Sequence, residues 1–471
     1  MLDVFWERSL AFLLFWGIWM LAPLAIDVTI AIAYLIMVMV FPEKKERENI
    51  PDLAYLPYVS VVIPVHNSAE TLFQCLLSVI NQKYPLDKIQ IICVNNGSSD
   101  NSFEIYSRFQ DEYPLVSSSW INMDRSGKSI ALNAGIYAIK GDYVINVDSD
   151  AWLDELAILR MAEAFEHDPS LAAATGAIHI DKELGDKTSF IDVVHYCEEI
   201  EYLVAFNVGR RYQSLTNNLF TLAGAFSAFR RDVILNSFMY SERTVSEDTD
   251  LTFHIRNRTK INKSRMACIS SSIAYVEPIT SMSKLYSQRV RWQRGQIEVT
   301  SLYSDVSGRF YKGLQSYAGR ILVADHTLAF SRLTWTFLVP FLYFLGYPLK
   351  LVFAAFVGLY VCYLFLDFLY FLVAVRESIG DYKNRIKKIW WVIFFLPIFR
   401  FFTYWFRVSG IILSLTEEAS WKTEDPVTQL KSSLRQTRRV LVKRIRCWRG
   451  ADNEPDKDVL EQQEESYPYI S

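Results

Sequence analysis

The pattern of apolar and polar positions divides the chain into membrane-like and soluble stretches. Between Ser9 and Phe41 the only charged residue is Asp27. A helix of about 33 residues would measure about 50 Å, well beyond the roughly 30 Å hydrocarbon core of a bilayer. We therefore expect a break at Pro23, followed by a spanning helix of about 20 residues that ends at Pro42. The acidic residues near the start favour a retained membrane segment over a cleaved signal peptide.

The next region has the pattern of a soluble α/β domain. Short β-branched runs predict strands at Val59–Val65, Lys88–Val94 and Tyr143–Val147, and apolar residues at helical spacing predict a helix within Ala69–Gln82. Strands that alternate with helices favour a mostly parallel sheet covered on both faces. Such sheets bind ligands at the carboxyl ends of their strands, so the candidate chemistry is sought there.

After about residue 280 the pattern becomes membrane-like again. Leu285–Leu302 is amphipathic, with arginines among aromatic and aliphatic residues, as expected of a helix lying at a bilayer interface. Two long apolar runs, Leu328–Leu345 and Leu351–Val375, predict a helical hairpin. The last apolar stretch, Ile389–Leu415, contains a proline and two arginines. We favour a re-entrant or interfacial segment plus a short span there, because the basic tail that follows should stay in the cytoplasm.

These patterns give six predicted regions. They are an N-terminal membrane region (1–42), a soluble α/β domain (55–280), interfacial helices (281–325), transmembrane helices (326–418), a basic amphipathic segment (419–449) and an acidic, disordered tail (450–471).

Composition and charge narrow the function classes. The chain has 471 residues, 51% of them hydrophobic, which favours a membrane protein. Its 49 basic and 52 acidic residues give a net charge of −3, so no global basic field indicates nucleic acid binding. The six cysteines form no CxxC pair, which favours neither a disulfide framework nor a zinc site.

The first candidate motif is Asp148-Ser149-Asp150, directly after a predicted strand. On extended backbone the two aspartates project from the same side. They can therefore grip one hard divalent cation while a nucleotide diphosphate supplies further oxygens. A solvated strand end is the competing interpretation.

Two further motifs lie beyond it. Ser246–Asp250 precedes an apparent helix, so its acids can complement the helix dipole, or one can act as a base that deprotonates an attacking hydroxyl. Gln288–Trp292 lies on the predicted interfacial helix, where it can contact lipid headgroups. Alternatively, its guanidinium can pair with a leaving pyrophosphate and its indole can stack on a sugar ring.

In this order the motifs resemble those of the processive family-2 glycosyltransferases, which include the synthases of cellulose, mixed-linkage glucan, chitin, hyaluronan and poly-N-acetylglucosamine. The resemblance covers roughly residues 20–425. It implies an α/β GT-A, Rossmann-like cytoplasmic domain combined with an α-helical transmembrane and interfacial-helix region. The family's DDG, DxD, TED and QxxRW motifs have as counterparts Asn95–Gly97, Asp148–Asp150, Ser246–Asp248 and Gln288–Trp292.

The resemblance also implies roles for individual residues. It implies Asp248 as the general base of an inverting displacement, with Glu247 beside it in the catalytic site, and Asp148 and Asp150 as ligands of Mg²⁺ or Mn²⁺. The implied donor-binding residues are Asn95, Asn96, Lys128, Asp148, Gln288 and Arg291. The implied acceptor-binding residues are Trp292, Gly224, Ala225 and Phe226. Trp421, Lys422 and Thr423 resemble a gating element.

One departure from the family pattern concerns the nucleotide. Asn95 and Asn96 stand where the family has paired aspartates. An amide oxygen still accepts a hydrogen bond but brings no charge. Either the nucleotide is bound through altered contacts, or the preference for the base is relaxed.

The resemblance predicts a processive enzyme in the plasma membrane, multi-pass, with its catalytic domain in the cytoplasm. Its expected partners are a nucleotide-sugar donor, preferably UDP-glucose, a growing polysaccharide and membrane lipids. The preferred product is a glucan, cellulose-like or with mixed 1,3 and 1,4 linkages. Alternatives are a poly-N-acetylglucosamine, chitin or hyaluronan-type product, a non-processive transfer of one sugar onto a lipid phosphate, and a catalytically dead scaffold of a synthase complex.

Overall fold

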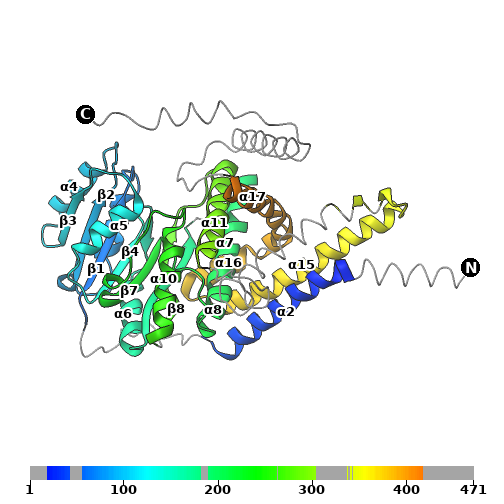
Figure 1. The fold of residues 1–471 in the computed structure, drawn as a ribbon, viewed down its shortest axis with the longest axis horizontal. Helices are drawn as coiled ribbons and strands as arrows, with labels where there is room; N and C mark the ends of the chain where they lie inside the picture. The colour runs from blue at the N-terminus through cyan, green and yellow to red at the C-terminus, as the bar shows by residue number, and fades with distance from the viewer. Residues whose placement is uncertain are drawn as a thin grey trace, which may run out of the picture.

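A mixed sheet of eight strands organises residues 59–276 of the computed structural model (Figure 1). The structure describes residues 18–42, 56–181, 189–262, 264–303, 337, 340–341 and 343–416. Its strands are β1 (Val59–Val65), β2 (Ile89–Asn95), β3 (Ser117–Asn122), β4 (Tyr143–Val147), β5 (Ala151–Leu153), β6 (Leu171–Ile180), β7 (Phe226–Arg230) and β8 (Arg265–Val276). They lie in the order β3-β2-β1-β4-β7-β6-β8-β5.

The sheet is mostly parallel, as expected: six of its eight strands run in the same direction, and β7 and β5 run against them. Strands β3, β2, β1 and β4 pair in parallel, whereas β7 runs antiparallel to both β4 and β6. A short apolar run has no direction of its own, since the path of the connecting segment decides how it enters the sheet. The reversal has a consequence for the site, because the start of β7 lies beside the end of β4, with Phe226 opposite Val147.

The helices that surround the sheet follow the strands along the chain. They are α3 (Leu72–Ile80), α4 (Ser102–Glu112), α5 (Lys128–Tyr137), α6 (Ala157–His167), α7 (Phe190–Val204), α8 (Arg211–Leu215), α9 (Arg231–Leu235) and α10 (Glu247–Asn262), with a 3-10 turn at Leu86–Lys88 and a π-helical turn at Ala205–Arg210. Every residue of β1 and β4 is buried. These strands read as continuous apolar runs because both faces of the sheet are covered.

A second group of helices extends away from the sheet (Figure 1). It consists of α2 (Ile18–Val40), α15 (Leu349–Glu377), α16 (Gly380–Lys388), a 3-10 turn (Trp390–Phe394) and α17 (Leu396–Thr416). Among the described residues, α15 and the segment Leu396–Ser414 of α17 are long and apolar enough to cross a membrane, and Leu24–Val40 is a shorter apolar helix. The predicted run Leu328–Leu345 lies largely outside the described residues, and residues 419–471 lie wholly outside them.

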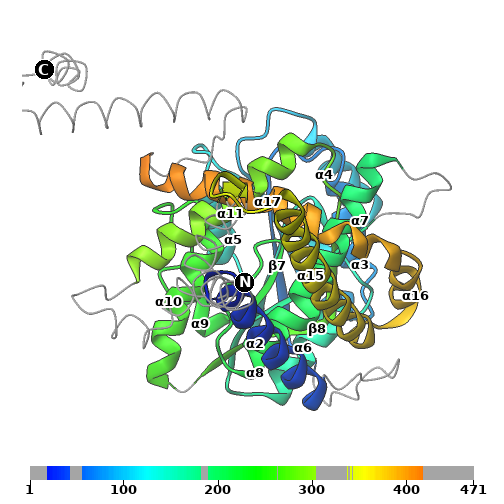
Figure 2. The same cartoon turned by 90° about the vertical axis from the view of Figure 1, so that its right-hand side faces the viewer.

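The expected break at Pro23 is wrong. Helix α2 begins at Ile18 and continues through Pro23 to Val40. A proline within the second turn removes one backbone hydrogen bond, and an apolar helix that packs against neighbours tolerates this loss. Here α2 lies along α15 (Figures 1 and 2), where the Tyr363 hydroxyl donates to the Asp27 carboxylate at 2.9 Å.

Buried ion pairs join the second group of helices to each other and to the sheet domain. Asp367 of α15 is 1% exposed and pairs with Arg400 of α17. Glu199 of α7, fully buried, pairs with Arg385 of α16 at 2.9 Å. Burial raises the pKa of Glu199 to about 7, although the Arg385 charge opposes that shift. These buried carboxylates are thus paired with arginines from other helices.

Helix α11 (Met282–Leu302) lies between the sheet domain and α17 (Figures 1 and 2). Two of the arginines expected at a bilayer interface are instead buried in ion pairs, Arg289 with Glu201 at 2.6 Å and Arg294 with Glu298 at 2.8 Å. An Arg407–Gln293 hydrogen bond of 2.6 Å ties α17 to α11. These side chains hold protein elements together.

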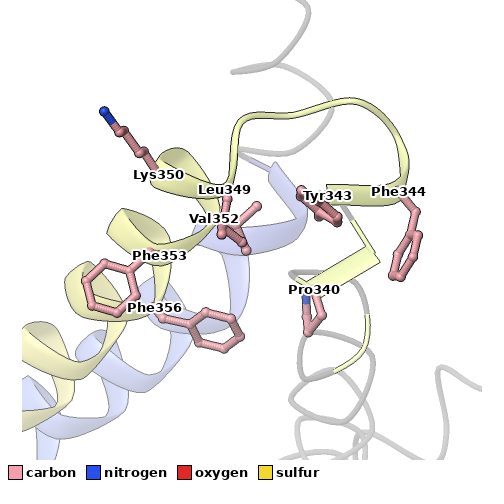
Figure 3. Close-up of a pocket in the computed structure, with 8 residues that line it drawn as sticks. All are labelled: Pro340, Tyr343, Phe344, Leu349, Lys350, Val352, Phe353 and Phe356. Carbon is pink, nitrogen blue, oxygen red and sulfur yellow. The ribbon is translucent and has the colours of Figure 1, made fainter.

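An apolar hollow of about 650 Å³ lies at the start of α15, at the far end of the helices from the sheet (Figures 1 and 3). Rings of Tyr343 and Phe344 line it together with Phe353 and Phe356 of α15. The hollow is remote from the strand ends at which ligands of α/β sheets bind.

The close approach of α11 to the segment before α10 requires glycine at position 295. A Cβ there would meet the Ser246 hydroxyl and lie 2.5 Å from Ser246 Cβ. We expect Gly295→Ala to lower the free energy of unfolding by about 1–3 kcal/mol, because the packed segment must shift. Thermal unfolding of the detergent-solubilised protein measures the change.

Gly358→Ala on α15 is the matched control, since a Cβ at Gly358 meets no atom within 4 Å. It should leave the unfolding temperature unchanged or raise it slightly through better helix propensity. Equal unfolding temperatures for the two variants would contradict the proposed packing constraint.

Candidate active site

The acidic pair after β4 lies at the edge where the parallel strands end. The Asp148 backbone N–H donates to the Ala225 carbonyl at 3.2 Å, and the Asn146 side chain donates to the Gly224 carbonyl at 2.6 Å. The antiparallel β7 therefore brings Gly224 and Ala225 next to the acidic pair. Asp148 is half-buried, whereas Asp150 is exposed.

Lys128 links this pair to the second acidic motif. Its ammonium group lies 2.7 Å from Asp148 Oδ1 and 3.6 Å from Glu247 Oε1. Burial alone would lower the pKa of Lys128, but the two carboxylates outweigh it and raise that pKa. Lys128 is therefore a fixed positive charge between two acidic segments that are far apart in the sequence.

Glu247 and Asp248 open helix α10 and differ in environment. Glu247 is 5% exposed, and burial raises its pKa while the Lys128 charge opposes the shift. Asp248 is half-buried; its Oδ2 accepts a 3.2 Å hydrogen bond from the Gly224 N–H and its Oδ1 one of 2.7 Å from the Thr249 N–H. A Cβ added to Gly224 would lie 3.4 Å from Asp248 Oδ2 and 3.6 Å from Lys128 Nζ. The predicted residues Lys128, Asp148, Gly224, Glu247 and Asp248 thus share one site.

Helix α11 carries Gln288, Arg291 and Trp292 and contacts this site from the side. Its Glu298 accepts a 2.9 Å hydrogen bond from the Val245 N–H, two residues before Glu247. Trp292 is 41% exposed, its ring centroid lies 6.1 Å from that of Tyr202, and the Arg289 guanidinium lies 4.6 Å from its ring. The Oε1 atom of Gln288 is buried without a hydrogen-bond partner among the described residues. The exposed indole of Trp292 offers an aromatic face on which a sugar ring can stack.

Asn95 and Asn96 build the loops at this edge of the sheet. Asn95 Oδ1 accepts from the Ser98 N–H at 2.9 Å, and its amide donates to Asn122 at 3.1 Å. Asn96 Oδ1 accepts from the Gly127 N–H, one residue before Lys128. The left-handed residue of this turn is Gly97, with φ of 70°. Asn96 thereby orients the loop that delivers Lys128.

Several site features escaped the sequence analysis. The hydrogen bond from Gly127 to Asn96 and the packing of Gly295 on Ser246 join segments with no shared sequence signal. The aromatic neighbour of Trp292, Tyr202, comes from α7, which carried no predicted motif. The proposed gating residues Trp421, Lys422 and Thr423 lie outside the described residues.

The two carboxylates after β4, those of Asp148 and Asp150, could act as ligands of a divalent cation. Among the described residues, no group of three or more His, Cys, Asp or Glu side chains could hold a metal ion. Mg²⁺ at phosphate-transfer sites, however, is commonly held by one or two carboxylates plus substrate phosphates and water. Asp148 and Asp150 are two carboxylates of that kind at the ligand-binding edge of the sheet.

Comparisons with known proteins agree with this picture. Residues 60–238 match the model of glycosyl transferase family 2. A poly-beta-1,6-N-acetyl-D-glucosamine synthase of Staphylococcus aureus is 27% identical over 257 residues, which cover 54% of this chain and 58% of that protein. A probable glycosyltransferase of Bacillus subtilis, YdaM, is 28% identical over 256 residues, or 53% of this chain and 57% of that protein. The chain thus spans little more than half the length of the curated relatives it matches.

A solved structure shares the fold. A mannosyltransferase from Pyrobaculum calidifontis, PcManGT, in complex with GDP-Man and Mn²⁺, superposes with a TM-score of 0.52 at 14% identity, covering 84% of this chain and 98% of that one. The expected GT-A, Rossmann-like architecture is confirmed. The relatives do not support the preferred glucan product and favour the poly-N-acetylglucosamine alternative.

The ion pairs of Lys128 with Asp148 and Glu247 should contribute to the stability of the folded protein. Lys128→Met leaves Asp148 and Glu247 facing each other without a cation, so we expect it to lower the free energy of unfolding by about 3 kcal/mol near neutral pH. Burial already raises the pKa of Glu247 and the Lys128 charge opposes that shift, so removing Lys128 raises this pKa further, and the variant should lose more stability as pH rises above the ordinary pKa of a glutamate. Chemical unfolding at several pH values measures both effects.

Two further variants sharpen this prediction. Adding Glu247→Gln to Lys128→Met removes the repulsion and should restore at least half of the lost stability. Lys83→Met breaks an exposed ion pair with Glu155 and should cost about 1 kcal/mol or less. If the Lys128 variant is as stable as the Lys83 variant, the claim that the Lys128 ion pairs stabilise the fold is wrong.

Proposed function

We propose, from the premise that residues 60–238 form a family-2 glycosyltransferase domain, that this protein is a membrane-bound, processive, inverting β-glycosyltransferase. In this proposal it builds a poly-N-acetylglucosamine from a nucleotide sugar, UDP-N-acetylglucosamine, and passes the chain through its own membrane helices.

The observation that carries the proposal is the cluster of Lys128, Asp148, Gly224, Glu247 and Asp248 at the ligand-binding edge of the sheet. Glycosyl transfer from a nucleotide sugar needs a base for a weakly acidic hydroxyl and positive charge for a departing diphosphate. The cluster offers a half-buried carboxylate and a fixed ammonium group within one site.

In the proposed reaction the Asp248 carboxylate takes the proton from the acceptor hydroxyl as its oxygen attacks the anomeric carbon of the donor sugar. The new bond joins that oxygen to the anomeric carbon. The bond from the anomeric carbon to the phosphate oxygen breaks, and the nucleoside diphosphate leaves with the electron pair. Asp248 suits the role of base because it is more accessible than Glu247, which is committed to Lys128.

The remaining site residues bind and orient the two substrates. Lys128, with Arg291 and the Gln288 amide, would compensate the charge of the leaving diphosphate, and Asn95 and Asn96 would shape the nucleotide end. Asp148 and Asp150 would hold Mg²⁺ or Mn²⁺, which adds positive charge at the diphosphate. Trp292 would seat the terminal sugar of the growing chain, close to Gly224, Ala225 and Phe226.

The choice of product follows the relatives. The staphylococcal protein is named as a synthase of poly-β-1,6-N-acetylglucosamine, whereas no relative reported above is named as a glucan synthase. We therefore propose N-acetylglucosamine in place of glucose as the donor sugar. Analysis of the polymer made from each nucleotide sugar determines the donor sugar and the linkage.

Membrane placement is part of the proposal. Helices α15 and α17, with the shorter apolar helix in α2, support a multi-pass protein of the plasma membrane. The basic residues of Arg376–Lys388 favour a cytoplasmic position for α16, and hence for the catalytic domain that contacts it through Glu199. The Trp421–Thr423 segment would gate the site, and the basic tail would contact anionic lipid.

Product analysis tests the proposed function. Purified full-length protein in nanodiscs, given radiolabelled UDP-N-acetylglucosamine and Mg²⁺ or Mn²⁺, should make high-mass material that a β-1,6-N-acetylglucosaminidase digests. Digestible polymer from UDP-glucose alone would indicate a glucan synthase. A single sugar on lipid would indicate a non-processive transferase, and absence of UDP release a scaffold.

Asp248→Asn tests the proposed base. The amide cannot accept the proton, so we expect polymer synthesis to fall by about 10²–10⁴-fold. Nucleotide affinity, measured by calorimetry, should stay within about twofold because Lys128 and Asp148 are unchanged.

Glu155→Gln, at an exposed carboxyl paired with Lys83, is the control and should retain full synthesis. Wild-type turnover in the Asp248 variant would remove the assignment of the base.

A further inference from the structure

Arg289 of α11 is held by a carboxylate from α7 and lies over the ring of Trp292. Its Nη2 atom lies 2.6 Å from Glu201 Oε2, and its Cζ atom lies 4.6 Å from the centroid of the Trp292 ring. Residues three apart on a helix are neighbours on its surface, so Arg289 and Trp292 meet on one side of α11. A continuous set of contacts therefore leads from the Glu201 carboxylate through the guanidinium to the indole.

The two α11 side chains in this set differ in exposure. Arg289 is 7% exposed, whereas Trp292 is 41% exposed. A cation attracts the face of an aromatic ring more strongly where it is shielded from water. The guanidinium occupies one face of the indole, which leaves the opposite face for a ligand.

A second contact from α7 further restricts the indole. Tyr202 directly follows Glu201, and its ring centroid lies 6.1 Å from that of Trp292, with 55° between the ring planes. The pair Glu201 and Tyr202 thus meets α11 twice, the carboxylate at Arg289 and the phenol ring at Trp292. A side chain with a cation over its face and a ring beside it has fewer accessible rotamers than a free one.

The packing of α11 places Trp292 at the candidate active site. Gly295, three residues further along, packs on Ser246, whose Cβ would lie 2.5 Å from a Cβ at that glycine. Ser246 stands two residues before Asp248. On the helix surface Trp292 therefore lies between Arg289, which contacts α7, and Gly295, which contacts the segment leading to the proposed base.

A purely structural role for Arg289 is the competing interpretation. Arg385 of α16 forms a comparable buried ion pair with Glu199 of α7, at 2.9 Å. Its guanidinium lies 5.8 Å from the ring centroid of Tyr382, which is itself buried. Arg289 instead lies over an indole that is open to solvent. A cation that only joins two helices does not require such an exposed ring.

We propose that Glu201 and Arg289 are positioning residues for the acceptor: Glu201 fixes the Arg289 guanidinium, which holds the Trp292 indole with its open face toward the terminal sugar. A tryptophan that is already ordered loses less conformational entropy when a sugar stacks on it. Both residues act through Trp292 and need not touch the sugar. This inference rests on the proposed function, in which Trp292 seats the end of the growing chain.

Fluorine NMR tests the positioning role without any turnover. Detergent-solubilised full-length protein is labelled with 5-fluorotryptophan, and the Trp292 resonance is assigned by its loss in Trp292→Phe. Arg289→Gln should broaden this resonance, because the ring then exchanges among several rotamers. Glu201→Gln leaves the Arg289 charge in place, so broadening in that variant, expected to a smaller extent, reports lost position and not lost charge.

Acceptor kinetics test the consequence for the reaction. Protein in nanodiscs receives UDP-N-acetylglucosamine and a soluble N-acetylglucosamine oligosaccharide as acceptor. Arg289→Gln should raise the acceptor KM by about three- to tenfold, as expected when one more side chain must be ordered on binding. The donor KM and kcat should stay within about twofold, because the residues proposed to bind the donor and to act as base are unchanged. Arg289→Lys, which keeps the charge without the planar group, should lie between Arg289→Gln and the wild type.

Arg385→Gln is the matched control, since it removes an arginine that also pairs with α7 but lies over Tyr382. It should lose thermal stability as Arg289→Gln does, while its Trp292 resonance and acceptor KM match the wild type. If Arg289→Gln does not fold, Glu201→Gln decides both readouts, because the Glu201 side chain is 27% exposed and tolerates the change more readily.

The outcomes distinguish this inference from the proposed function. If both α11–α7 variants keep the wild-type Trp292 resonance, raise the donor KM instead of the acceptor KM, or change the acceptor KM no more than Arg385→Gln does, the inference is wrong while the proposed function stands. If the wild type transfers no N-acetylglucosamine at all, the proposed function fails and the inference falls with it.

Discussion

Two carboxylates from distant parts of the chain share one ammonium group in this protein. Asp148 ends the first half of the sheet and Glu247 opens α10, and Lys128 at the start of α5 lies between them. Without that charge, burial and mutual repulsion would drive the two acidic segments apart or protonate them. The ammonium group therefore allows a dense cluster of acids to exist at one edge of the sheet. Asp248 lies in the same cluster because it directly follows Glu247 in the sequence.

Helix α11 ties this cluster to the helices that extend from the sheet domain. Gly295 of α11 packs on Ser246, and Arg289 of α11 pairs with Glu201 of α7. Gln293 of α11 accepts a hydrogen bond from Arg407 of α17. Three elements thus fix one rigid helix, and that helix presents Trp292 next to Tyr202. The position of the proposed acceptor-binding tryptophan consequently depends on both the sheet domain and α17.

Asn95 and Asn96, which stand where the family has paired aspartates, make hydrogen bonds that hold the neighbouring loops. Their amide groups donate as well as accept, so Asn95 bonds to both Ser98 and Asn122, and Asn96 holds the Gly127 N–H. A carboxylate could accept these N–H bonds but could not donate to Asn122. The loss of negative charge also leaves the acidic cluster around Lys128 without further repulsion from this side.

The sequence by itself determined the local elements and the chemical inventory. The β-branched runs predicted β1 and β4 with their observed bounds and β2 to within one residue, because continuous apolar stretches reflect burial on both faces. The order of the acidic, basic and aromatic motifs indicated a resemblance to family-2 glycosyltransferases, and residues 60–238 match the model of that family. The roles of the motif residues stay predictions. Tertiary structure alone decided the antiparallel insertion of β7, which brings Gly224 beside Asp148, and the burial of Arg289 and Arg294 in ion pairs. These features depend on contacts between segments far apart in the chain, and periodicity and composition carry no information about which distant side chain a charge will meet.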